Sequence, residues 1–316
     1  METRIPRWLA LALAAACGAL MAVQARINGE LGHVLGDGFT AAAISFGSGL
    51  VILSIGMLVS RRGRVGAARV VQAVRGGGLR WWMLLGGAAG AFLVLTQGLV
   101  AAVLGVALFT IALVAGQTIS GLVIDVVGLG PSGKHPLSAT RVAGAVVALA
   151  AVTWAVSGEF GSGVAWWAVL LPLLAGLGIG WQQAVNGRVR ITADSALTAT
   201  FGNFLVGTIV LVVAALVHIA IVGPPAPFPS DPWLYSGGAL GCIFIALTAL
   251  LVRRTGVLLL SLATIAGQLL AALLLDLFAP VPGDVVDAAT IGGTALALVA
   301  VAIGSWNPRR RLSRAR

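Results

Sequence analysis

The chain has 316 residues, of which 59% are hydrophobic and only 9% charged, and its mean hydropathy of +1.03 excludes a water-soluble globular protein. A net charge of +10 would favour nucleic acid as a partner of a soluble protein, but here the basic residues lie between apolar segments, as in membrane proteins. Ten acidic residues, three histidines and two cysteines leave little material for a metal cluster, a catalytic pair or a disulfide framework, so we expect neither an enzyme nor a cofactor.

Apolar runs and the breaks between them predict ten membrane-spanning helices, because one span needs about 20 apolar residues. In chain order they cover residues 8–27, 38–60, 81–103, 106–127, 138–156, 164–186, 196–221, 233–252, 256–279 and 288–306. The first run resembles a secretory signal peptide, but nine further runs follow it, so we interpret it as a retained span.

The basic residues predict the orientation of these spans, since Lys and Arg are retained on the cytoplasmic side. If the N-terminus is inside, all of the 20 Lys and Arg residues except Arg26 fall on inner segments. One span too many or too few would destroy this asymmetry. We therefore expect a multi-pass protein of the inner (plasma) membrane with both termini in the cytoplasm.

Internal repetition is the strongest pattern in the sequence. Six residues recur 158 positions later and eight more recur 151 positions later. The first set is Gln24, Asn28, Gly29, Thr40, Phe46 and Gly49, which matches Gln182, Asn186, Gly187, Thr198, Phe204 and Gly207. The second set is Trp82, Gly86, Gly87, Gly90, Gly105, Gly116, Gln117 and Asp125, which matches Trp233, Gly237, Gly238, Gly241, Gly256, Gly267, Gln268 and Asp276. The gene has been duplicated.

Each repeat holds five predicted spans, an odd number, so the second copy enters the membrane from the opposite side. The predicted fold is an all-α membrane protein of two inverted five-helix repeats, residues 1–157 and 158–316. Such symmetry is typical of secondary transporters that work by alternating access, although some channels share it.

Polar residues inside the spans are the candidate substrate contacts. Gln117 and Gln268 lie near mid-span at equivalent repeat positions, at the depth where transporters bind solutes. The alternative is that they join neighbouring helices by hydrogen bonds. Ser45 and Asn203 are also equivalent and could line a path or bond to the backbone.

Two amide pairs have the spacing i and i+4, which places each pair on one helix face. Gln24 with Asn28 falls near the outer surface, and Gln182 with Asn186 falls near the inner one. They are candidate gates, or each Asn with the glycine that follows it ends its helix as a C-cap. Trp181, beside Gln182, is a candidate substrate contact.

Asp125 and Asp276 are the acidic residues that lie well within apolar runs. Ionisable groups in such places are candidates for proton coupling. Both are near helix ends, however, where a structural role or a neighbouring arginine is the alternative.

The segments "VQARINGELG" and "TAAAISFGSGL", with their echoes "WQQAVNGRVR" and "TATFGNFLVGT", resemble the signature of the YdcZ-type branch of the drug/metabolite transporter superfamily. The later "GLVIDVVG" and "ALLLDLFA" are similar to that family too. The resemblance covers both halves and implies a ten-helix, EamA-like inner-membrane protein in its fused two-repeat form, described as an exporter of small molecules.

The sequence therefore predicts a secondary transporter that exports a small neutral or zwitterionic metabolite or drug. The alternative is a passive channel or facilitator. Its expected partners are the small-molecule substrate and the lipid bilayer, with proton coupling as an open option and no nucleic acid. The chain is expected to act as a monomer or homodimer.

Overall fold

The computed structural model describes residues 6–130, 133–134, 138–157, 166–255, 257–280 and 286–305, and all the regular structure within these ranges is helical. The α-helices are α1 (Arg7–Leu35), α2 (Gly38–Val59), α3 (Arg61–Arg75), α4 (Gly86–Val127), α5 (Ala139–Ser157), α6 (Trp166–Ala193), α7 (Ala196–Val222), α8 (Gly237–Thr255), α9 (Val257–Phe278) and α10 (Ala288–Ser305). Two 3₁₀ turns, η1 (Trp81–Leu85) and η2 (Pro232–Tyr235), precede α4 and α8.

Every predicted span overlaps one of these helices, and six helical segments of the described chain are long and apolar enough to cross a membrane. One of the six, Trp81–Val127, covers two predicted spans. Its α4 portion is interrupted at Gly105, whose φ of 71° and ψ of 159° are not helical. α4 therefore consists of two helical segments, in agreement with the predicted break between residues 103 and 106.

The C-cap interpretation of the two Asn–Gly pairs is wrong. α1 continues through Gly29 to Leu35 and ends at Gly36, which has a left-handed φ of 62°. α6 likewise continues through Gly187 to Ala193. Gly29 allows α1 to pack closely on α4, since a Cβ built there would lie 2.9 Å from the Cβ of Ala101.

The arginine-rich segment after α2 forms a helix that we did not predict. Ser60 caps α3 by accepting a hydrogen bond from the Gly63 N–H, and Val70 on its apolar face is buried. Arg62 and Arg69 both contact Asp194, one of the two residues between α6 and α7. The hydrogen bond and charge of Arg62 lower the pKa of Asp194.

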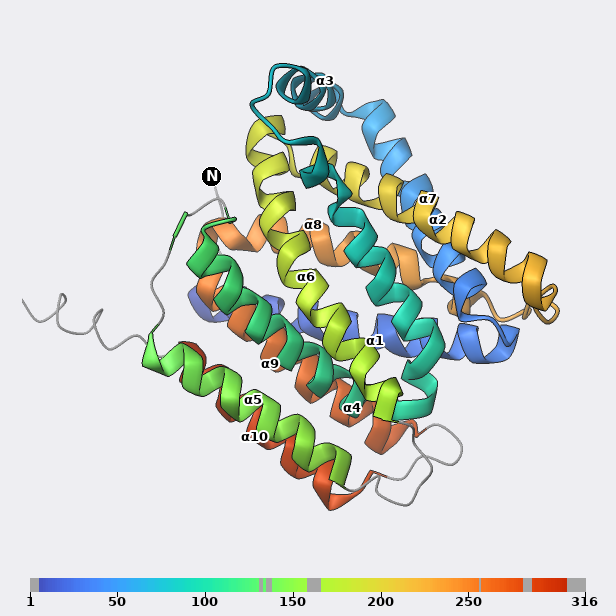
Figure 1. Cartoon of the computed structure of the whole chain (residues 1–316), viewed down its shortest axis with the longest axis vertical. Helices are drawn as coiled ribbons and strands as arrows, with labels where there is room; N and C mark the ends of the chain where they lie inside the picture. The colour runs from blue at the N-terminus through green and yellow to red at the C-terminus, as the bar shows by residue number, and fades with distance from the viewer. Residues whose placement is uncertain are drawn as a thin grey trace, which may run out of the picture.

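Helices from the two halves of the chain pack in pairs. α1 lies along α9, the second segment of α4 lies along α6, α2 lies along α7, and α5 lies along α10. Figure 1 shows α5 and α10 together at one edge of the molecule, and α2 and α7 together at the opposite edge. In the repeat alignment α1 corresponds to α6 and α9 to the second segment of α4, so the α1–α9 pair is equivalent to the α6–α4 pair. α2 corresponds to α7 and α5 to α10, so each of these two pairs joins a helix to its own equivalent.

Glycines bring the first two pairs into backbone contact. A Cβ on Gly18 would lie 1.9 Å from the Thr264 carbonyl oxygen, and one on Gly267 would lie 2.0 Å from that of Ala15. The α4–α6 crossing repeats this geometry: a Cβ on Gly176 would lie 2.1 Å from the Leu113 oxygen, and one on Gly116 would lie 2.0 Å from that of Leu173. All four contacts join positions that are equivalent at the repeat spacings of 158 and 151 residues.

The substitution Gly116→Ala should therefore destabilise the protein. The added methyl group cannot fit unless α4 and α6 move apart, and such overpacking costs about 1–3 kcal/mol or more. Gly202→Ala on α7 is the matched control, because a Cβ there meets nothing within 4 Å. Thermal unfolding followed by circular dichroism in detergent should show a lower Tm for Gly116→Ala only. Equal melting of the two variants would contradict the proposed role of the crossing.

Candidate functional site

Three amide side chains of the second half form one hydrogen-bonded group, called here the second amide cluster (Gln182, Asn186 and Asn203). Gln182 and Asn186 lie one turn apart on α6, and both donate to Oδ1 of Asn203 on α7, each at 2.9 Å. The structure thus brings together three residues that the sequence placed on two different spans. One acceptor oxygen of α7 thus holds two donors of α6 at the contact between these helices.

The first half contains an equivalent group, the first amide cluster (Gln24, Asn28, Ser45 and Gln97). Nδ2 of Asn28 donates to Oε1 of Gln97 on α4 at 2.7 Å. Asn28 is fully buried, and among the described residues neither its Oδ1 nor the hydroxyl of Ser45 has a hydrogen-bond partner. Sequence analysis missed Gln97, because the residue 151 positions later is Thr248 and no repeat identity marks the site.

Each amide cluster faces glycines at the start of a helix from the other half. A Cβ on Gly86 of α4 would lie 2.8 Å from Oδ1 of Asn186, and one on Gly237 of α8 would lie 2.3 Å from Oδ1 of Asn28. One turn further, Gly90 approaches Gln182 and Gly241 approaches Gln24 in the same way. The two clusters therefore form equivalent contacts between the halves.

Phe46 and Phe204, the same position in the two repeats, stack on each other with ring centroids 4.8 Å apart and an interplanar angle of 28°. Each ring also lies over the glycine of the partner repeat. A Cβ on Gly207 would be 2.3 Å from Phe46, and one on Gly49 would be 2.3 Å from Phe204. A residue that contacts its own repeat equivalent marks the local axis relating the two halves.

Gln117 and Gln268 are not part of either amide cluster. Gln268 is buried and Gln117 is half-buried, and their backbones lie at the glycine crossings with Gly176 and Gly18. Within the described part of the chain, no hydrogen bond of either side chain is found. Trp181 packs in an apolar cluster with Val185 and Val189 of its own helix.

Asp276 stabilises the helix break at Gly105. Its two carboxylate oxygens accept hydrogen bonds from the backbone N–H groups of Val106 (3.0 Å) and Ala107 (2.6 Å). These are the first N–H groups after the break, which the interrupted helix leaves without partners. Asp125, the repeat equivalent, instead forms an ion pair with Arg141 of α5. Gly256, the repeat equivalent of Gly105, lies outside the described residues.

Two arginines bind the carbonyl ends of helices from the other half. Arg26 of α1 donates to the carbonyl of Ala279, directly after α9, at 2.6 Å. Arg188 of α6 donates to the carbonyls of Gly128, Leu129 and Gly130, directly after α4. Each cation meets the negative end of a helix dipole, and each such contact joins the two halves.

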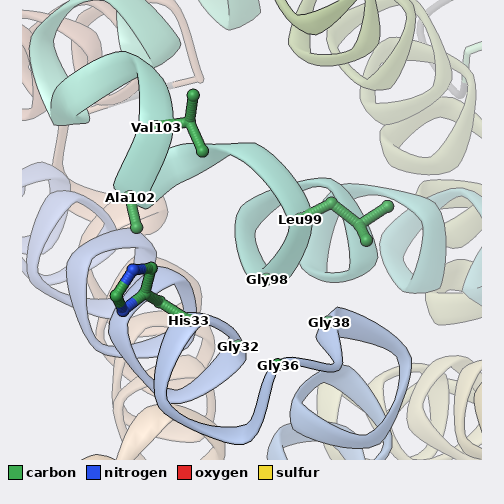
Figure 2. A pocket seen from close by; sticks show the side chains of 8 residues that line it. All are labelled: Gly32, His33, Gly36, Gly38, Gly98, Leu99, Ala102 and Val103. Atoms are coloured by element: carbon green, nitrogen blue, oxygen red, sulfur yellow. The ribbon is translucent and has the colours of Figure 1, made fainter.

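A pocket of about 140 Å³ lies between the end of α1, the start of α2 and the first segment of α4. Figure 2 shows its lining, which consists of Gly32, His33, Gly36, Gly38, Gly98, Leu99, Ala102 and Val103. None of these is a predicted site residue, and the pocket is smaller than those that hold drug-sized ligands. No group of three His, Cys, Asp or Glu residues suitable for a metal ion occurs among the described residues.

Comparison with known protein families finds a match that covers residues 9–154 and 167–303. The matched family is described as "Putative inner membrane exporter, YdcZ". The chain belongs to this family. Since one matched segment lies in each half, it is a two-repeat YdcZ-type protein. A search of curated proteins finds no match.

Membership of the YdcZ family confirms the resemblance seen in the sequence and identifies the chain as a multi-pass inner-membrane protein of an exporter family. The apolar helices agree with this assignment. The family description of this YdcZ-type chain names no solute.

Replacement of Asp276 tests whether its carboxylate caps the helix that follows Gly105. Asp276→Leu leaves two buried N–H groups unpaired, at a cost of about 1–3 kcal/mol each, and should lower the Tm strongly. Asp276→Asn keeps one acceptor oxygen and should melt between this variant and the wild type. Asp125→Asn is the control, since its ion pair is partly exposed and worth about 0–1 kcal/mol. If Asp276→Leu melts like the wild type, the capping role is wrong.

Proposed function

We propose that this protein is a secondary exporter of a small neutral or zwitterionic metabolite or drug, working by alternating access between two five-helix halves of inverted topology. The halves are residues 1–157 and 158–316. Family membership supports export. The odd number of predicted spans per repeat and the placement of the arginines support the inversion.

In this topology both termini are cytoplasmic, and the ends of α1 and α7 face the outside. The first amide cluster then lies near the outer surface and the second near the inner surface. The equivalent packing pairs α1–α9 and α6–α4 fit such an arrangement. So does the Phe46–Phe204 stack, because a two-fold axis requires equivalent residues to meet where it passes.

The observation that carries the proposal is the reciprocal contact between each amide cluster and glycines of the other half. Asn28 faces Gly237, and Asn186 faces Gly86. If the halves exchange conformations, one contact tightens as the other opens, which is how two gates alternate. The two contacts already differ in exposure, since Asn28 is fully buried whereas Asn186 is half-buried.

The chemistry of the clusters favours an uncharged or zwitterionic solute. Amide groups supply hydrogen-bond donors and acceptors without a net charge. In the first amide cluster, Oδ1 of Asn28 and the Ser45 hydroxyl are free to bind a polar group of the solute once the Gly237 contact opens. Gln117, Gln268 and Trp181 remain proposed contacts at mid-membrane depth.

Coupling through Asp276 would require its carboxylate to release two backbone N–H groups, and coupling through Asp125 would break its pair with Arg141. We therefore favour structural roles for both aspartates. The second candidate function is a passive facilitator, which the scarcity of titratable groups within the spans favours. The protein would act within the lipid bilayer as a monomer or homodimer.

Efflux from cells tests the proposal. Cells that express the wild type should extrude at least one compound of a broad metabolite and drug panel faster than cells with empty vector, and a proton uncoupler should abolish the difference. Asn28→Ala combined with Asn186→Ala should reduce this efflux by tenfold or more, about 1.4 kcal/mol, since both gates lose their amide contact.

Gln183→Ala is the matched control, because Gln183 is next to Gln182 on α6 but is exposed. It should leave efflux unchanged. Efflux that survives the uncoupler would favour the facilitator. Equal efflux from the Gln183 variant and the double asparagine variant would show that the amide clusters are not part of the transport pathway.

A further inference from the structure

Asp37 and His218 form a buried contact between the two halves of the chain. Asp37 precedes α2, and His218 lies near the end of α7. Oδ1 of Asp37 and Nδ1 of His218 are 3.3 Å apart, with the Asp37 side chain 2% and the His218 side chain 25% exposed. A nearly buried carboxylate is expensive in an apolar protein unless it has partners that use its charge.

Helix capping explains the position of Asp37 but not its charge. Its carboxylate accepts hydrogen bonds from the Phe39 N–H and from the Thr40 hydroxyl. Ser195, its repeat equivalent, caps α7 by accepting a hydrogen bond from the Thr198 N–H at 3.2 Å. Since an uncharged serine suffices for the cap in the second half, the negative charge at Asp37 is available for another purpose.

The imidazole of His218 is held in place beside this carboxylate. Its ring stacks on Phe39 with centroids 4.6 Å apart and an interplanar angle of 19°. Nδ1 is buried, and its contact with Asp37 does not meet hydrogen-bond geometry. Histidine changes its charge between about pH 5 and 8. A proton from the solvent that binds His218 would convert this weak contact into a charge-assisted bond with the Asp37 carboxylate.

Other ionisable groups do not contact the pair within the described residues. α2 has none, and His218 is the only one on α7. On the remaining elements that pack against α2 and α7, Arg26 and Glu30 of α1 pair with each other, His33 is exposed, and Tyr235 of η2 donates to the Pro229 carbonyl. Asp231 is exposed. Arg62 and Arg69 of α3 contact Asp194. Arg188 of α6 contacts the carbonyls after α4, and Asp125 of α4 pairs with Arg141. The thiol of Cys242 on α8 contacts the Gly49 carbonyl.

The contact borders the pocket. Gly36 and Gly38, which flank Asp37, both line it opposite Leu99 of α4 (Figure 2). The segment after α7 returns to the same place, where the Ala226 N–H donates to the Leu35 carbonyl at 2.9 Å. A stronger bond between Asp37 and His218 therefore fixes the end of α7 against the turn that forms one wall of the pocket.

We propose that Asp37 and His218 form a proton-binding site and that protonation of His218 closes the pocket between α1, α2 and α4. Proton binding and closure favour each other, because the ion pair exists only when both have occurred. The proposal deepens the transport function argued above and rests on its topology for one point, that the pair faces the outside. Acid outside the cell then closes the outer face.

Labelling of a single cysteine tests this site without any transported solute. Leu99→Cys is introduced into protein in which Cys17 and Cys242 are replaced by alanine, and the purified full chain in lipid nanodiscs is treated with a polar maleimide. Phe228→Cys, at an exposed loop position, corrects for the effect of pH on thiol reactivity. The corrected rate at residue 99 should fall about fivefold or more between about pH 8 and pH 5.

Two variants should abolish this pH dependence. His218→Gln removes the titrating ring, and Asp37→Ser copies Ser195, so that it removes the charge and keeps the helix cap. Asp37→Ser should melt like the wild type, whereas Asp37→Ala should melt earlier. A corrected rate that is independent of pH in the wild type, or that remains dependent on pH in His218→Gln, overturns the proposal. Efflux without pH-dependent labelling would refute the proton site alone, and labelling without efflux would refute the transport function alone.

Discussion

Close approach of helix backbones at four glycines is the constraint on which the structure depends. Lipid tails are as apolar as leucine, so helices in a bilayer gain little from burial of apolar side chains against each other and associate through tight packing. Gly18, Gly267, Gly116 and Gly176 supply that packing, and each joins helices of opposite halves. Asn28 follows Gly18 by ten residues, or about 15 Å of helix, so the crossing also fixes where the amide cluster lies.

Most of the few charged residues near the spans form hydrogen bonds with backbone groups. Water is absent from the bilayer core, so a helix break or a helix end must find its partners within the protein. Asp276 supplies acceptors for the break at Gly105, and Arg26 and Arg188 supply donors for the ends of α9 and α4. An ionisable group that satisfies backbone atoms is poorly suited to exchange protons. The Asp37–His218 contact differs, because Nδ1 of His218 bonds to no backbone group of the described residues and the cap at Asp37 could be made without a charge.

Much of the fold could be predicted from the sequence, since apolar runs and their breaks report directly on spans. The break at Gly105 and the shared helix face of Gln182 and Asn186 were predictable in the same way. α3 was not, because its arginines suggested a loop, whereas Val70 and Val74 pack against the body of the protein. The extension of α1 beyond Gly29 was also missed, because a glycine in a long helix costs only about 1 kcal/mol and here permits contact with α4.

The candidate site was harder to predict because the two halves preserve interactions more closely than residues. Gln97 bonds to Asn28 with no identical residue in the second repeat to draw attention to it. Ser45 stands where the second half has Asn203, whose Oδ1 accepts from both neighbouring amides, whereas the Ser45 hydroxyl has no partner among the described residues. Arg26 and Arg188 both donate hydrogen bonds to carbonyls at the end of a helix, from positions that are one helical turn apart in the repeat alignment. A helix end can be reached from either of two successive turns by a long side chain, so the position of the arginine is free to change while the contact stays. Repeat identity thus marks amides that both halves share, such as Asn28 and Asn186, and misses contacts made by different residues in the two halves, such as those of Gln97 and Arg26.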